Sequence, residues 1–212
     1  MNGSRGSTSR RASGRAVLLA VAVTLLIAAS SRAEPSGDTA AKSTCPLLSP
    51  QECSFRFAYG YSDRDSLSFY TFGPRVAYDL PALVPAIAGN RIRIGLEMTG
   101  SIINGDINKN AGEFALSPLI FDYRYDNGGM LVPFIEGGEG IVLTTLDDIN
   151  IGGPFEFSSQ GGGGFHFFVS KENAITFAFR FRHISNSGIK SPNSGLNTYF
   201  FNVGFSRFPN RR

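Results

Sequence analysis

The sequence predicts an all-β fold, an eight-stranded antiparallel up-and-down β-barrel that spans a membrane. After residue 54, apolar and polar residues alternate with the period of two that β-strands show, in segments separated by turn residues. The chain is also rich in aromatic residues and glycine, with 19 Phe, 7 Tyr and 25 Gly, and only 17% of its residues are charged. Many charged residues lie on the faces opposite the aromatic ones, as in a transmembrane barrel with a polar lumen.

The amino terminus has the composition of a secretory signal peptide, which we assign to residues 1–33. Arginines precede an apolar run over residues 16–29, and Ser31-Arg32-Ala33 supplies small residues for cleavage. This run, about 14 residues long, is too short to cross a bilayer as a helix. We therefore expect export through the periplasm, with the cell outer membrane as the destination of the barrel.

Residues 34–54 are rich in Pro, Ser and Thr, and we interpret them as a periplasmic lead-in to a barrel over residues 55–212. Cys45 and Cys53 fall in this lead-in, where a disulfide and two free thiols are both compatible with the sequence. A formal net charge of +3 with scattered basic residues argues against nucleic acid as a partner. No motif has the spacing of metal ligands or of a phosphate loop, so we expect no metal and no cofactor.

The first half of the barrel is expected to contain four strands, over residues 55–61, 67–80, 91–103 and 113–125. The third is the clearest, because Ile92, Ile94 and Leu96 alternate with charged residues and glycine. Asp126-Asn127-Gly128-Gly129 then forms a strong tight-turn signal. The connector over residues 80–90 is long for a periplasmic turn.

The second half continues with strands over residues 130–144 and 155–170 and a long hairpin over residues 175–208. In the hairpin, two alternating runs flank a cluster of Gly, Pro, Asn and Ser, which is the pattern of two strands and their loop. The residues that carry charge opposite the aromatic faces are Arg56, Arg91, Arg93, Glu97, Glu156, Arg180 and Arg182. An outer-membrane barrel pairs such charges in its lumen, whereas a soluble lipocalin-like barrel, the alternative, would hold them in a dry core.

The last hairpin also carries the residues that point to chemistry. Its aromatic face, with Phe179 and Phe181, continues into His183 and Ser185 because strand side chains alternate. Polar side chains that face lipid cost free energy unless they lie at the interface or bind something polar. A histidine and a serine on one face can form a nucleophile and its base. The alternative is a pair of polar rim residues in a structural barrel.

The pairing register of this hairpin can be predicted from its loop. Centring the loop near Ser191 places Ser185 opposite Asn197, which makes Asn197 a diagonal neighbour of His183 that can orient the ring.

The same procedure on the preceding turn, centred near Glu172, places Gly161 opposite His183 and Gly163 opposite Phe181. Glycines there would leave a shallow groove for an acyl chain beside the histidine. A bend or bulge in the strand is the alternative interpretation.

These residues resemble a known family. His183-Ile184-Ser185-Asn186-Ser187-Gly188, followed by Pro192-Asn193-Ser194-Gly195-Leu196-Asn197 and an aromatic terminal strand, is similar to the PagL-type lipid A 3-O-deacylases. The resemblance implies an outer-membrane esterase that hydrolyses the 3-O-linked 3-hydroxyacyl chain of lipid A at a site on the lipid-facing surface. The expected partner is the lipid A of lipopolysaccharide in the outer leaflet, and a homodimer is left open.

The resemblance also implies residue roles. Ser185 is the expected nucleophile and His183 the general base, while Asn186 and the backbone around Gly188 stabilise the oxyanion. The family's best-known member has a glutamate where this chain has Asn197; asparagine can hold a histidine tautomer but supplies no full charge. The competing function is a non-enzymatic outer-membrane barrel with a structural or adhesion role.

Overall fold

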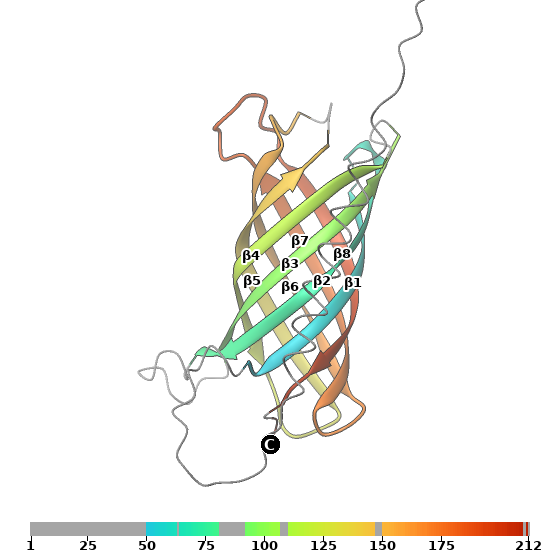
Figure 1. Ribbon diagram of the computed structural model, residues 1–212, viewed down its shortest axis with the longest axis vertical. Coiled ribbons are helices and arrows are strands. Elements are labelled where there is room, and N and C mark those ends of the chain that lie inside the picture. The colour runs from blue at the N-terminus through green and yellow to red at the C-terminus, as the bar shows by residue number, and fades with distance from the viewer. Residues whose placement is uncertain are drawn as a thin grey trace, which may run out of the picture. The chain divides into compact units, whose positions relative to one another are not determined.

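The computed structural model describes residues 50–62, 64–80, 92–106, 110–146, 150–209 and 211. Within them the chain forms a closed barrel in which each strand pairs antiparallel with its sequence neighbours and β1 pairs with β8 (Figure 1). The predicted fold class is confirmed. The strands are β1 (Glu52–Ser62), β2 (Leu67–Asp79), β3 (Ile92–Asn104), β4 (Ala111–Arg124), β5 (Leu131–Thr144), β6 (Phe155–Phe168), β7 (Asn173–Ser185) and β8 (Leu196–Arg207).

The barrel begins earlier than predicted, since β1 starts at Glu52 and includes the last residues of the expected lead-in. Cys53, within β1, is a free cysteine, while Cys45 and the expected signal peptide lie outside the described residues. A short 3-10 turn, η3 (Arg64–Ser66), links β1 to β2. No helix in the described ranges has the length and apolar character needed to cross a membrane.

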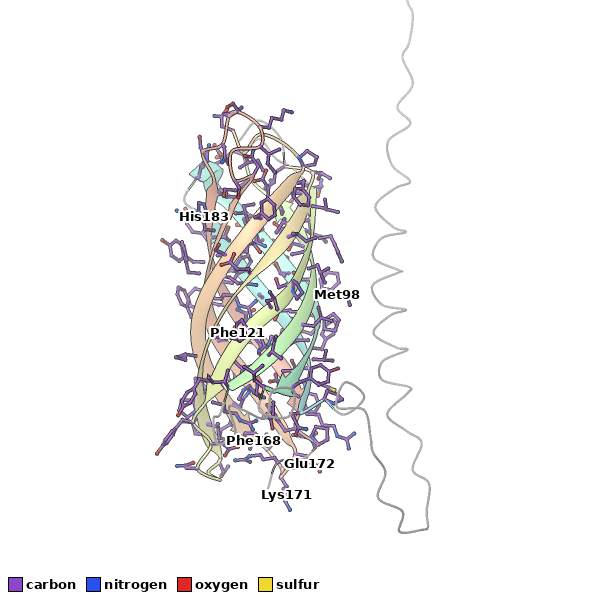
Figure 2. All side chains as sticks on the ribbon, turned by 90° about the vertical axis from the view of Figure 1, so that its left-hand side faces the viewer. Met98, Phe121, Phe168, Lys171, Glu172 and His183 are labelled. Carbon is purple, nitrogen blue, oxygen red and sulfur yellow. The ribbon has the colours of Figure 1, made fainter. Side chains whose placement is uncertain are left out.

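The outward face of the barrel is apolar and aromatic, as the alternation predicts. Phe57, Ile135 and Phe201 expose 61%, 66% and 63% of their surface, although each lies in the middle part of a strand. Such exposure of large apolar side chains, repeated around the wall, is the pattern of a lipid-facing surface. Figure 2 shows side chains projecting outward from the strands along the length of the barrel.

The lumen is filled by ion pairs centred on Glu136. Its Oε1 accepts hydrogen bonds from Arg180 at 3.0 and 2.6 Å, and its Oε2 accepts one from Arg75 at 3.0 Å. Arg75 also bonds Asp122 at 2.6 Å. Beside Arg180, a cavity of about 30 Å³ that Arg56 and Glu97 also line has room for a water molecule or two. The charges predicted to face the lumen are buried there: Arg56, Arg93, Glu97, Glu156, Arg180 and Arg182; Arg91 is outside the described residues.

Above the ion pairs, an apolar cluster closes the end of the lumen where β7 finishes and β8 begins, at the top of Figure 1. Ile184 and Leu196 are fully or almost fully buried in it, and they are paired with each other across β7 and β8. Because side chains alternate, their strand neighbours His183 and Asn197 project outward. The cluster therefore anchors the two strands directly behind the outward face described next.

Candidate active site

The predicted nucleophile and base lie on the outer surface, close to the top of the barrel. His183 and Ser185 are half-buried outward-facing residues at the end of β7, and β7 ends at Ser185. Figure 2 shows His183 near this end, far from Lys171 and Glu172 at the other. Their placement on one face next to the β7–β8 loop agrees with the prediction from the sequence.

Asn197 contacts His183 more directly than predicted. The two residues are directly paired across β7 and β8, not diagonal, and Nδ1 of His183 lies 2.7 Å from Oδ1 of Asn197. An amide oxygen only accepts, so Nδ1 carries the hydrogen and Nε2 is left with a lone pair. This tautomer leaves Nε2 as the ring nitrogen that can act as a base.

Gly195 holds the other edge of the imidazole ring. A Cβ placed on Gly195 would lie 2.5 Å from Cε1 and 3.0 Å from Nε2 of His183, and its φ of +62° is one that side chains rarely adopt. The last pair of β7 and β8 is Ile184 with Leu196, and Gly195 immediately precedes Leu196 in the chain. The Cε1–Nε2 edge of the His183 ring therefore lies against Gly195. Arg64 of η3 donates a hydrogen bond to the Gly195 carbonyl.

The two groups expected to stabilise an oxyanion have other bonds in this structure. Asn186 is buried, and its side-chain amide donates to the carbonyls of Ile151 at 2.9 Å and Lys190 at 2.8 Å. The Gly188 N–H donates to Oδ1 of Asn186 at 2.9 Å. These donors hold the β7–β8 loop against the β5–β6 loop, and the oxyanion role expected for Asn186 stays a prediction.

The two glycines of the predicted groove lie two residues further from the top of the barrel, relative to β7, than predicted. Gly161 is paired with Phe181 and Gly163 with Phe179, while Ser159 is the residue opposite His183. A Cβ on Gly161 would have its nearest neighbour, the backbone oxygen of Glu136, at 3.8 Å, so the outward side of this position is open. At Gly163 the corresponding distance is 2.9 Å, which leaves no such room.

Two polar residues that the sequence did not single out, Ser159 and Glu139, lie on the strands next to His183. Ser159 Oγ donates a hydrogen bond of 2.7 Å to Glu139 of β5, and both side chains are exposed on the outward face. The sequence did not show which side chains in the glycine-rich centre of β5 face outward. Ile135 and Ile141 could have shown it, because odd-numbered residues of β5, including Glu139, share their face. Among the described residues, no group of three His, Cys, Asp or Glu could hold a metal ion.

Comparison with known proteins was made for sequence and for structure. The family model described as "Lipid A 3-O-deacylase (PagL)" matches residues 73–206. The "Lipid A deacylase PagL" of Pseudomonas aeruginosa is 33% identical over 96 residues, which are 43% of this chain and 53% of the relative. The protein of the same name from Bordetella bronchiseptica is 32% identical over 125 residues, 56% of this chain and 67% of the relative. The chain thus spans about half to two thirds of these relatives.

Two solved structures share the fold. The crystal structure of "the outer membrane enzyme PagL" has a TM-score of 0.53 at 21% identity, covering 71% of this chain and 97% of that chain. The crystal structure of Neisserial surface protein A has a TM-score of 0.54 at 10% identity, covering 74% and 94%. At these identities the two likenesses establish the barrel architecture.

Proposed function

This chain belongs to the PagL family of lipid A 3-O-deacylases, and we propose that it is an outer-membrane esterase that removes the 3-O-linked 3-hydroxyacyl chain of lipid A. One observation carries the proposal. His183, oriented by Asn197 at 2.7 Å, and Ser185 share the lipid-facing side of β7 inside the segment that the family model matches.

The position of the site suits a lipid substrate. β1 begins and β8 ends at the bottom of the barrel, so a barrel with both ends in the periplasm turns its top toward the outer leaflet (Figure 1). An ester of lipid A in that leaflet then approaches Ser185 sideways, from the membrane. The filled lumen has no part in this route.

The proposed reaction proceeds through an acyl-serine. Nε2 of His183 takes the proton of the Ser185 hydroxyl while Oγ attacks the ester carbonyl carbon, and the carbonyl oxygen becomes an oxyanion. As the tetrahedral intermediate collapses, the bond to the sugar oxygen breaks and His183 gives that oxygen its proton. Water, activated by His183, then attacks the acyl-serine, which releases a 3-hydroxy fatty acid and restores the serine.

Two groups support these steps. Asn197 keeps Nδ1 protonated, so the lone pair stays on Nε2, the ring nitrogen that we assign as the base toward Ser185. For the oxyanion, the Gly188 N–H is the donor we assign, with its present bond to Asn186 exchanged for the substrate oxygen when the ester binds. Asn186 then acts by holding the loop in place.

The test is mass spectrometry of lipid A from cells that express the protein or its variants. The parent should remove one 3-hydroxyacyl group, and Ser185→Ala and His183→Ala should each abolish the loss. Ser68→Ala removes another serine of the barrel, bonded to Tyr59, and should leave the activity intact. Unchanged lipid A, with the parent shown to be folded in the outer membrane, would instead favour a structural or adhesion role.

A further inference from the structure

Glu139 places a carboxyl group on the apolar outer wall. Glu139 is paired with Leu119 of β4, which exposes 48% of its surface. Ile141 is the next residue after Glu139 on the same face of β5. An ionisable group among lipid-facing apolar side chains is costly and is generally retained for function. The hydrogen bond from Ser159 at 2.7 Å occupies only part of its capacity to accept.

The carboxyl group is aligned with the proposed active site. Glu139 is paired with Ser159, Ser159 with His183, and His183 with Asn197, so the four residues form one outward polar row across β5 to β8. Neighbouring strands are about 4.8 Å apart, a distance that the first carbons of a bound acyl chain can bridge. Ser159 and Glu139 thus lie within one or two strand spacings of the His183–Ser185 pair.

Immediately below this row, β5 and β6 carry no outward side chain. Gly137 of β5 is paired with Gly161 of β6, and a Cβ on either would have a backbone oxygen as its nearest neighbour, at 3.5 and 3.8 Å. Phe181 is the residue paired with Gly161 on β7, and Ile135 is the next outward residue below Gly137. We call Gly137 and Gly161 the glycine track. It offers an extended chain a place to lie against the backbone.

The polar row therefore lies between the nucleophile and the glycine track. Consider an acyl chain whose ester carbonyl lies at Ser185 and whose tail lies on the glycine track. The first few carbons of that chain would lie next to Ser159 and Glu139. Because the Ser159 hydrogen is donated to Glu139, these two side chains present acceptors to the chain. They suit a hydroxyl group, and they repel a phosphate.

We propose that Glu139, supported by Ser159, determines specificity by accepting a hydrogen bond from the hydroxyl group on the third carbon of the acyl chain. The tail then lies along the glycine track. This inference rests on the proposed function. It assigns to β5 and β6 the recognition of the group that distinguishes a 3-hydroxyacyl ester from a simple acyl ester.

The experiment compares two lipid A esters that differ only in that hydroxyl group. The full protein in detergent micelles should have a kcat/KM at least about 100-fold higher for the 3-hydroxyacyl ester, because an analogue without the hydroxyl leaves the acceptors without a donor. Glu139→Leu should lower kcat/KM for this ester about 100-fold and change the other less than about threefold. Glu139→Gln keeps an acceptor oxygen and should retain part of the preference. Glu172→Leu, at the opposite end of the barrel, should change neither rate.

Three results would overturn the assignment. An equal fall on both esters in Glu139→Leu, in a barrel that still shows heat-modifiable migration, would mean that Glu139 acts through His183 or through stability. Equal rates of the parent on both esters would remove the selectivity itself, while leaving the proposed esterase in place. Hydrolysis of neither ester by the parent would overturn the proposed function as well.

Discussion

Nδ1 of His183 lies 2.7 Å from Oδ1 of Asn197, across directly paired positions of β7 and β8. The bond fixes the ring tautomer with a neutral acceptor. A protonated imidazole would therefore keep its Nδ1–H hydrogen bond to Asn197 but would have no full opposite charge beside it. An acidic residue at this position would both fix the tautomer and stabilise the positive charge of the imidazolium. Asn197 can do only the first of these.

The first prediction concerns this pair. Asn197→Asp keeps the size and adds a charge, so kcat should rise about tenfold, since charge-assisted hydrogen bonds are roughly twice as strong as neutral ones. Asn197→Leu removes the acceptor and should lower kcat by at least about 100-fold, because the tautomer is no longer fixed. Rates on a lipid A ester across pH measure both effects. A leucine variant as fast as the parent would show that Asn197 has no orienting role.

The second prediction concerns Gly195. Gly195→Ala would bring a methyl group within 2.5 Å of the His183 ring and place a side chain at a φ of +62°. We expect kcat to fall at least about tenfold, because a small misplacement of a catalytic group is costly. Gly128→Ala is the matched control, since Gly128 has a φ of +80° with nothing within 4 Å. Equal loss in both variants would indicate backbone strain as the cause.

The third prediction concerns the glycine track. Gly161 has a neighbour no closer than 3.8 Å and an ordinary φ, so Gly161→Leu should fold and cover the track. Hydrolysis of a long-chain ester should fall at least about tenfold, because the leucine side chain occupies the place of the tail and so shifts the ester away from Ser185. A short-chain ester should be affected much less. Gly100→Leu, on β3 with a neighbour at 3.9 Å, is the control. An equal fall in the hydrolysis of both esters would contradict the proposal that the acyl tail lies on the glycine track.

The fourth prediction concerns the lumen. Glu136 accepts hydrogen bonds from Arg56, Arg75 and Arg180. Glu136→Ala should destabilise the barrel by about 3–5 kcal/mol, because it leaves buried cations without their partner. Glu172→Ala breaks only an exposed pair with Arg207 at 3.6 Å and should cost less than about 1 kcal/mol. Urea unfolding in micelles measures both. Similar midpoints for the two variants would show that the ion pairs are energetically neutral.

The fifth prediction concerns pH. Arg211 holds Asp126, in the β4–β5 turn, at 3.0 and 3.1 Å. Burial opposes ionisation of this carboxyl group, but the hydrogen bonds from Arg211 and the Gly128 N–H prevail and lower the pKa of Asp126. A lowered pKa in the folded state stabilises it above the ordinary value of about 3.9, and this stabilisation is lost as pH falls further.

Acidification from neutral pH to about pH 3 should therefore lower the urea midpoint less in Asp126→Asn than in the parent. The variant should also be less stable at neutral pH, where the parent's carboxylate bonds Arg211. If the urea midpoint fell equally in both proteins, the Arg211–Asp126 pair would make no contribution to stability.

The sequence predicted the faces of the strands better than their register. Alternation places His183 and Ser185 outside without knowledge of their partners. A slip of two residues leaves every side chain on its face, so alternation cannot detect it. This is why Asn197 was expected diagonal to His183 and Gly161 was expected opposite it, each two residues away from the observed pairing.

Residues that act through distant contacts could not be predicted from local pattern. Glu136 meets Arg180 and Arg56 only because the barrel closes, since the partners are 44 and 80 positions apart in the chain. Asn186 was assigned to the oxyanion from the resemblance alone. In the structure its amide bonds nearby backbone carbonyls, as asparagine side chains in loops commonly do.

The filled lumen has a consequence for the cell that carries this barrel. The outer membrane protects a bacterium by excluding small toxic solutes, and every open pore weakens that protection. Here ion pairs and an apolar cluster occupy the interior, with a cavity of only about 30 Å³ among the charged side chains. A barrel whose proposed site lies on its outside wall can be made in many copies without adding a leak. With the proposed activity, it would remodel the membrane surface while leaving the permeability barrier intact.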